Sequence, residues 1–346
     1  MTQSLASSLS AAEAARHAER LVAALDRHVL GQRQAAELMV AAYLAGGHVL
    51  LEGIPGLGKT LLARAFAAAL GLEFQRVQFT PDLMPADVLG TNVYQAATQE
   101  FRLVRGPIFT QILMADEINR TPPKTQSALL EAMQEAQVTI DGDRHRLDAG
   151  FFVVATQNPI ELEGTYPLPE AQLDRFLLRV DLSLPPMAAE VELYRRAVSG
   201  QAWGHDDLPA AVVAPEVASA LRRASRAVHV SDPLLDYLAR LAAGIRASER
   251  LELAISPRGA LALLETARAM ALLEGRDFAI PDDFKRCLIP CWRHRLILDA
   301  ESELEGRSAR DLLDELAAAV EVPHGAQEAQ PEGPTAKEFA EAGPTP

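Results

Sequence analysis

Cysteine is scarce in this sequence, which excludes a protein held together by a framework of disulfides. Only Cys287 and Cys291 occur among 346 residues, four positions apart on a predicted helix. No second pair completes a zinc site, and the eight histidines show no metal-ligand spacing. So few cysteines are typical of a reducing compartment, and we therefore expect a cytoplasmic protein.

Long apolar runs are also missing. The longest run, at 38–51, is interrupted by Gly46, Gly47 and His48, and the first 20 residues lack a basic region followed by an apolar stretch. We therefore expect neither a signal peptide nor insertion into a membrane. Apolar residues still make up 49% of the chain and charged residues 23%, which is typical of a globular protein of two or three domains.

Positive charge is in deficit. Lysine and arginine together number 33 against 47 acidic residues, and only four of the 33 are lysines. The net charge of -14 disfavours non-specific binding of nucleic acid, so we expect no nucleic-acid partner. The excess is uneven, because residues 301–346 hold eleven acidic residues and three basic ones. Residues 322–346 are rich in Pro, Gly, Ala and Glu and are predicted to form a disordered tail.

Before Pro185-Pro186 the chain alternates helical periodicity with short apolar runs. Helices are predicted at 11–28, 32–45 and 59–70, and strands at 48–52, 74–79, 112–115, 151–156 and 176–182. Continuous apolar runs are typical of strands buried on both faces, so the alternation predicts a parallel sheet. Two further segments, 91–105 and 137–147, are predicted hairpins, the second around the turn Asp141-Gly142.

After Pro185-Pro186 the periodicity is helical almost throughout. Helices are predicted at 188–198, 215–228, 233–248, 258–274, 281–288 and 309–320. We therefore divide the chain into an α/β core at 1–184, a smaller all-α domain at 185–321 and the tail at 322–346. Within the second domain we expect Trp292 in the core and the basic residues 293–295 in surface ion pairs.

A glycine-rich segment fits the pattern G-x-x-x-x-G-K-[ST] and lies between a predicted strand and a predicted helix. It consists of Gly53, Ile54, Pro55, Gly56, Leu57, Gly58, Lys59 and Thr60. In such a P-loop the glycines let backbone N–H groups surround phosphate oxygens, and the helix N-terminus adds partial positive charge. Lys59 would reach the β- and γ-phosphates, and the Thr60 hydroxyl would bind Mg²⁺. The segment therefore predicts a site for ATP and Mg²⁺.

Two acids, Asp116 and Glu117, end the predicted strand that begins at Ile112. A solvated strand end gives the same pair, but the P-loop about 60 residues earlier favours a Walker B motif. Asp116 would hold Mg²⁺ through its water shell, and Glu117 would act as general base on the attacking water. Because a small-molecule kinase must exclude water, a water-activating acid at this position favours hydrolysis.

Four strings together closely resemble the MoxR family of AAA+ ATPases over roughly residues 20–320. They are Gly53 to Thr60, Asp116-Glu117-Ile-Asn-Arg-Thr-Pro-Pro-Lys-Thr-Gln126, Ala155-Thr-Gln-Asn-Pro159 and Leu168-Pro-Glu-Ala-Gln-Leu-Asp-Arg-Phe176. The resemblance implies a P-loop NTPase (AAA+) core with a parallel sheet, followed by a smaller all-α lid. It also places the two hairpins as the insertions of the helix-2-insert clade, which includes the magnesium-chelatase ATPase subunits.

The resemblance implies three further site residues. Asn158 resembles sensor 1, which orients the lytic water, although an Asn before Pro159 could equally cap a turn. Arg175 resembles the arginine finger that completes a neighbouring subunit's site; its structural alternative is an ion pair with Asp174 or Glu170. Arg258 resembles sensor 2, which couples the γ-phosphate to the lid, and the first turn of a helix is otherwise an unfavourable place for a cation.

By resemblance, the protein is a homo-oligomer, a hexameric ring, that acts like a chaperone on a client or adaptor protein. The usual partner in the family carries a von Willebrand factor type A domain, and the work includes maturation, activation or metal-cofactor insertion. Three alternatives stay open. A DNA-directed motor would use the basic residues of the 137–147 hairpin, a slow nucleotide-controlled binding module would need no Glu117, and a metal-chelatase subunit would differ only in its client.

Overall fold

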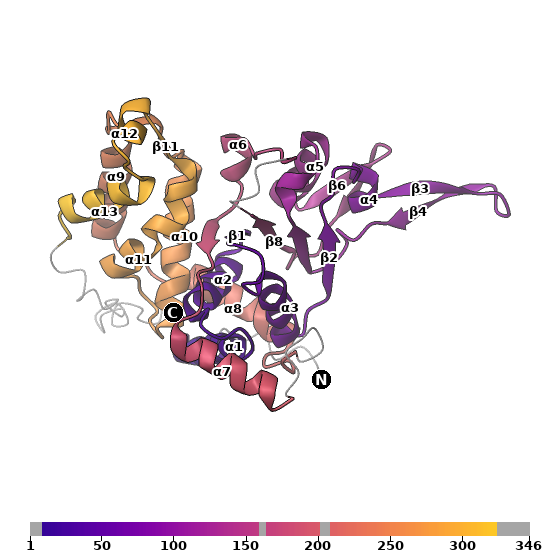
Figure 1. The fold of residues 1–346 in the computed structure, drawn as a ribbon, viewed down its shortest axis with the longest axis horizontal. Helices are drawn as coiled ribbons and strands as arrows, with labels where there is room; N and C mark the ends of the chain where they lie inside the picture. The colour runs from indigo at the N-terminus through magenta and orange to yellow at the C-terminus, as the bar shows by residue number, and fades with distance from the viewer. Residues whose placement is uncertain (1–8, 159–163, 201–207, 324–346) are drawn as a thin grey trace, which may run out of the picture.

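A five-stranded parallel sheet forms the centre of the molecule (Figure 1). The computed structural model describes residues 9–158, 164–200 and 208–323. The strands are β1 (Val49–Glu52), β2 (Phe74–Gln78), β5 (Ile112–Asp116), β8 (Phe152–Gln157) and β9 (Leu178–Asp181). They pair in the order β2-β5-β8-β1-β9, which confirms the predicted parallel sheet.

Apolar cores lie on both faces of this sheet. Alternate residues of β1 enter opposite clusters, since Val49 and Leu51 belong to one and Leu50 to the other. Burial on both faces explains why these strands are short continuous apolar runs. The first cluster extends without interruption from the helices beside the sheet into the C-terminal helices.

Helices of the core begin and end at residues that the sequence marks clearly. They are α1 (Ala11–His28), α2 (Arg33–Ala45), α3 (Lys59–Leu70), α4 (Pro85–Leu89), α5 (Pro123–Glu135) and α6 (Glu170–Leu173). A capping box between Ser10 and Glu13 starts α1. Gly58 and Gly71, both with positive φ, flank α3. The predicted bounds of α1 and α3 are therefore confirmed.

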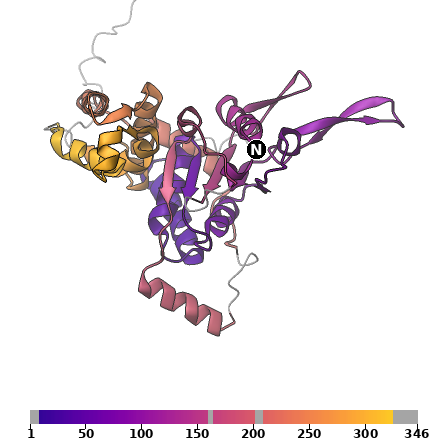
Figure 2. The same ribbon diagram turned by 45° about the horizontal axis from the view of Figure 1, so that its top comes forward.

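Two antiparallel hairpins extend from the core, as predicted. The hairpin β3 (Gly90–Gln95) and β4 (Glu100–Arg105) projects furthest (Figures 1 and 2). The neighbouring rings of Tyr94 and Phe101 on it are exposed. The hairpin β6 (Gln137–Ile140) and β7 (Asp143–Arg146) turns through Asp141 and Gly142, both at positive φ.

The chain after the sheet is mostly helical. Its helices are α7 (Met187–Val198), α8 (Pro215–Ala227), α9 (Asp232–Arg246), α10 (Pro257–Leu273), α11 (Pro281–Trp292), α12 (Ala300–Leu304) and α13 (Ala309–Ala319). The helix α7 lies apart from the others, with no buried residue (Figure 2). No helix in the described ranges is both long and apolar enough to cross a membrane. Residues 324–346 of the predicted tail lie outside the described residues.

Three features of this region differ from the sequence-based expectations. A two-stranded sheet, β10 (Leu251–Leu253) and β11 (Ile297–Leu298), joins the helices, and α11 continues through Pro290 to Trp292. Residues 293–295 form the 3₁₀ helix η2 (Arg293–Arg295). The expected ion pair is observed for Arg293, which pairs with the exposed Asp181. The expected surface position is wrong for His294 and Arg295, which are buried. Trp292 is fully buried, as expected.

Candidate active site

The glycine-rich segment forms a loop between β1 and α3, where an anion could bind. Gly56 and Gly58 have φ values of +88° and +85°, which favour glycine. A Cβ atom added at Gly56 would meet nothing within 4 Å, so the tip of the loop is open. No side chain caps the N-terminus of α3, which leaves its first N–H groups to face a ligand. The loop therefore fits a bound phosphate chain.

Lys59 lies between this loop and the neighbouring strand. Its Nζ donates to the carbonyl oxygen of Gly53 at 2.6 Å and to that of Gln157 at 3.2 Å. Gln157 ends β8, which pairs with β1. The ammonium group is thus placed at the carboxyl edge of the sheet, where ligands of α/β proteins bind.

Asp116 is at the same edge, at the end of β5. Its Oδ1 accepts a hydrogen bond from Thr156 Oγ1 at 2.6 Å, and its Oδ2 accepts two from Arg76, Nε at 3.0 Å and Nη2 at 2.6 Å. Carboxylate and hydroxyl oxygens suit Mg²⁺, so Asp116 and Thr60 fit the ligand chemistry of the predicted metal. Within the described ranges no cluster of three His, Cys, Asp or Glu side chains offers another metal site.

Glu117 is held next to Asp116 by the same hydroxyl group. Its backbone N–H donates to Thr156 Oγ1 at 2.8 Å, and its Oε2 accepts from Gln78 Nε2 at 2.7 Å. Arg120 Nε lies 3.1 Å from the same carboxylate oxygen. Glu117 has a φ of +57°, unusual for a residue other than glycine and typical of strained functional positions. Thr156 thus holds the carboxylate of Asp116 and the backbone of Glu117, while Gln78 and Arg120 contact the Glu117 carboxylate.

Sequence reasoning missed three residues of this group: Arg76, Gln78 and Thr156. Arg76 and Gln78 lie on β2, which pairs with β5, so their polar side chains end beside the two acids. Their position near the carboxyl end of a predicted strand could have indicated these two residues. For Thr156 the signal was its position two residues before Asn158, in a string that the sequence already marked.

Asn158 follows β8 directly and is buried, with 5% of its surface exposed. Its neighbour Gln157 contacts Lys59 through the backbone carbonyl. Pro159, on which the turn-cap alternative depends, lies outside the described residues. The role of Asn158 as sensor 1 stays a prediction.

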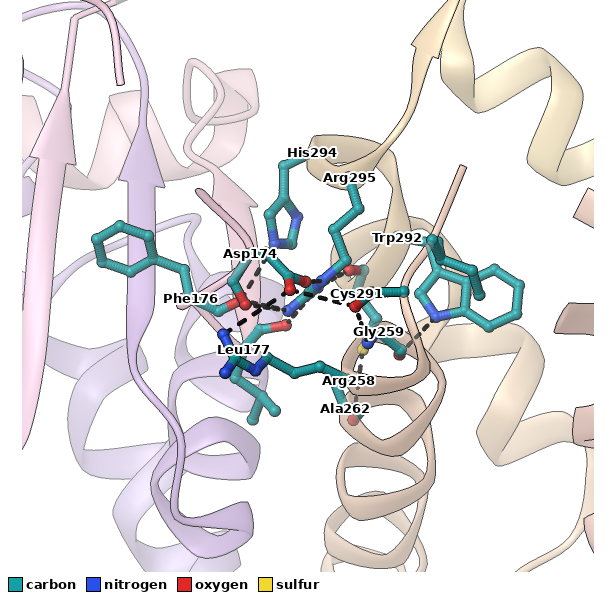
Figure 3. Close-up of polar contacts among 12 residues, drawn as sticks. Asp174, Phe176, Leu177, Arg258, Gly259, Ala262, Cys291, Trp292, His294 and Arg295 are labelled. Carbon is teal, nitrogen blue, oxygen red and sulfur yellow. Dashed lines mark hydrogen bonds and ion pairs between the residues drawn. The ribbon is translucent and has the colours of Figure 1, made fainter. Parts of the chain in front are cut away.

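Arg258 belongs to a second group, around Asp174 (Figure 3), whereas the side chain of Arg175 lies elsewhere. Arg258 is the second residue of α10, and its Nη1 lies 3.9 Å from Asp174 Oδ2. Arg175 is half-buried between α6 and β9 and lines a polar groove with Glu131 and Arg144. Over the described ranges Arg175 forms no ion pair, so the structural alternative for this residue is not observed.

Burial shifts the pKa values of three groups, one just before β1 and two near the end of α11. Burial is the main cause that lowers the pKa of His48, just before β1, to about 4. Burial also lowers the pKa of His294 well below its ordinary value and raises that of Cys291 to about 11. Both histidines are therefore neutral near pH 7, and the Cys291 thiol is protonated.

Comparison with known proteins agrees with this geometry. Residues 48–178 match the ATPase family associated with various cellular activities (AAA), and residues 243–316 match the AAA lid domain. The chain is 46% identical to the uncharacterized protein YeaC of Bacillus subtilis, over 86% of this chain and 92% of that one. It is 39% identical to Chaperone MoxR1 of Mycobacterium tuberculosis, over 88% and 82%. A crystal structure from Cytophaga hutchinsonii superimposes with a TM-score of 0.82 at 36% identity, over 90% of this chain and 97% of that one.

Proposed function

The chain belongs to the MoxR family of AAA+ ATPases, and from that premise we propose that it hydrolyses Mg²⁺-ATP in a ring to remodel, mature or activate a partner protein. The observation that carries this proposal is the double contact of Thr156. One hydroxyl group bonds the carboxylate of a candidate metal ligand, Asp116, and the backbone of a candidate general base, Glu117, at the strand edge that also holds Lys59. We assign 1–184 to the core, 185–321 to the lid and 322–346 to a tail.

The loop and its neighbours divide the work of hydrolysis. Backbone N–H groups of residues 53–60 and the Lys59 ammonium bind the phosphates, and Thr60 and Asp116 hold the metal. Bound Mg²⁺ would neutralise charge on the phosphate oxygens. Glu117 accepts a proton from the attacking water, and the buried Asn158 orients that water.

Assembly completes the site. We assign Arg175 as the finger that reaches the nucleotide of the next subunit, and Arg258 as the residue that couples the γ-phosphate to the lid. The half-buried Arg175 has its neighbour Asp174 neutralised by another arginine, which supports a role between chains. A hexameric ring is the assembly that we propose.

The client is proposed from a relative and from one surface. The name Chaperone MoxR1 supports chaperone-like work on another protein, and we propose a partner with a von Willebrand type A domain and metal-cofactor insertion as one form of maturation. The exposed Tyr94 and Phe101 on the projecting β3–β4 hairpin support contact with such a partner. Cys287 and Cys291 are free and buried, which agrees with the cytoplasmic location that we propose.

Turnover per chain across a wide range of protein concentration tests the proposal. We expect Mg²⁺-dependent hydrolysis whose rate per chain rises with concentration, because sites are completed between subunits. Lys59→Ala removes the ammonium group that we propose binds the β- and γ-phosphates, and it should therefore weaken ATP binding about 100-fold. A flat, very slow rate, with ATP bound as tightly by Lys59→Ala as by the natural chain, would refute the motor.

Mixing two inactive variants tests the finger. Arg175→Ala should bind ATP but hydrolyse it about 10³-fold more slowly, and Glu117→Gln should bind ATP without turnover. Together they should recover part of the activity, because Glu117→Gln chains supply the finger that Arg175→Ala chains lack. No recovery, with mixed rings confirmed by mass, would exclude a role for Arg175 between subunits.

A further inference from the structure

A buried lid arginine, Arg295, donates hydrogen bonds to backbone carbonyl groups on both sides of position 175 (Figure 3). Arg295 is 5% exposed. Its Nε donates to Asp174 Oδ1 at 2.7 Å, and its Nη2 donates to the carbonyl oxygens of Asp174 at 3.2 Å and Phe176 at 2.6 Å. Its Nη1 donates to the carbonyl oxygens of Leu177, at 3.3 Å, and of Cys291. One guanidinium group therefore binds the residues before and after Arg175, which we assign as the finger.

Other lid side chains hold the same segment. His294 Nε2 lies 3.1 Å from the carbonyl oxygen of Phe176, and because that oxygen can only accept, the neutral ring donates from Nε2. Ser256 Oγ donates to Asp174 Oδ2 at 3.2 Å, and Arg258 Nη1 lies 3.9 Å from that oxygen. The contacts come from two parts of the lid, the start of α10 and the 3₁₀ helix η2 that follows α11.

These two parts of the lid are fixed to each other. Trp292 Nε1 donates to the carbonyl oxygen of Gly259 at 2.8 Å, next to Arg258. A Cβ atom added at Gly259 would lie 3.0 Å from Arg295 Cδ, so the glycine lets Arg295 pass close to α10. Arg258 and Arg295 are thus connected through packed groups.

We propose that Arg295 is a positioning residue, which holds residues 174–177 so that Arg175 of the same chain is presented to the next subunit. The inference rests on the proposed function of Arg175 as a finger in trans. It adds that the position of Arg175 is controlled by the lid of the chain that donates this finger, through Arg295. The neighbouring chain, which hydrolyses the ATP, does not control it. A planar fork with several fixed donors suits this role, because it restrains the segment at several points at once.

Hydrogen–deuterium exchange tests the clamp without any hydrolysis. In Arg295→Lys the charge remains but the fork is lost, and we expect the amides of Phe176 and Leu177 to exchange about tenfold faster. Arg293→Gln is the matched control, because Arg293 lies on the same 3₁₀ helix and pairs with Asp181 instead. Equal exchange in Arg295→Lys and the natural chain would overturn the proposal. If Arg295→Lys does not fold, Asp174→Asn weakens the same contact with little change of shape.

Mixed rings test whether the effect belongs to the donating chain. The donor chain carries Glu117→Gln and keeps its finger, and the acceptor chain carries Arg175→Ala and keeps its general base. We expect Arg295→Lys in the donor to reduce the recovered turnover at least fivefold, and the same change in the acceptor to leave it within twofold. Arg293→Gln should have little effect in either chain.

The outcomes separate the two proposals. No recovery from the donor and acceptor without further changes would reject the finger in trans, while the exchange experiment still decides the clamp. Recovery that Arg295→Lys lowers equally in both chains would overturn the positioning role, because the residue would then act on its own site or on folding. Recovery unaffected by Arg295→Lys in the donor would overturn it as well.

Discussion

Acid should destabilise this protein through His48, one of its most deeply placed titratable groups. Val153 N–H donates to His48 Nδ1 at 3.0 Å, so Nε2 carries the proton and donates to the carbonyl oxygen of Met133 at 3.1 Å. Adding a proton at Nδ1 would break the bond to Val153, which lies on β8. Burial, with a smaller effect of the Arg222 charge, lowers the pKa of His48 from 6.5 to about 4.

The sign and size of the effect follow from this shift. Between pH 6.5 and about 4 the unfolded chain binds a proton at His48 that the folded chain does not bind. The free energy of unfolding therefore falls as the pH is lowered through this window, by about 1.4 kcal/mol per pH unit and about 3 kcal/mol in total. Between pH 7 and pH 5 the loss due to His48 is about 2 kcal/mol.

Urea unfolding followed by circular dichroism at pH 7 and pH 5 measures this loss. The comparison is with His48→Gln, which cannot titrate at this position. Over the same interval the free energy of unfolding of this variant should fall by about 2 kcal/mol less than that of the natural chain. The difference between the two chains removes the contributions of other groups, including the buried His294. Equal losses in both chains, or an NMR titration of His48 near pH 6.5 in the folded protein, would refute the reasoning.

Three further predictions concern the candidate active site and the β3–β4 hairpin. Gln78→Ala should lower kcat about tenfold with unchanged ATP affinity, since it removes one hydrogen bond to Glu117, the proposed general base, and steady-state kinetics with a separate binding assay checks this. Arg76→Gln should lower the Mg²⁺ concentration for half-maximal turnover several-fold, because the guanidinium occupies an oxygen of Asp116, the proposed metal ligand; a higher requirement would contradict that competition. Gly106→Ala should destabilise the chain by about 1–3 kcal/mol in urea unfolding, because its Cβ atom would lie 2.3 Å from the carbonyl oxygen of Val88 at the base of β3 and β4.

Local signals in the sequence predicted much of the fold. The bounds of α3 follow from Gly58 and Gly71, and the turn of β6 and β7 follows from Asp141-Gly142, since each signal acts within a few residues. The parallel sheet followed from apolar runs buried on both faces.

Contacts between distant segments could not be predicted in this way. Arg295 is buried because carbonyl groups about 120 positions earlier accept its hydrogen bonds, and nothing in the basic string 293–295 indicates them. The orientation of Asp116 by Thr156 likewise spans 40 positions. Helix α11 continues past Pro290 because Cys291 and Trp292 are buried in the lid, which offsets the hydrogen bond that proline cannot make.

The order of the strands has a consequence for biosynthesis. In the sheet, β8 lies between β5 and β1, although it is synthesised after both. While the chain emerges from the ribosome, the strands that carry the phosphate-binding loop and the acidic pair have no direct contact with each other. Within the sheet they are joined through residues 152–157, which pair with both of them. A nascent chain that stops before Phe152 therefore has both halves of the site but no assembled site, and it must be kept from aggregating until the central strand arrives.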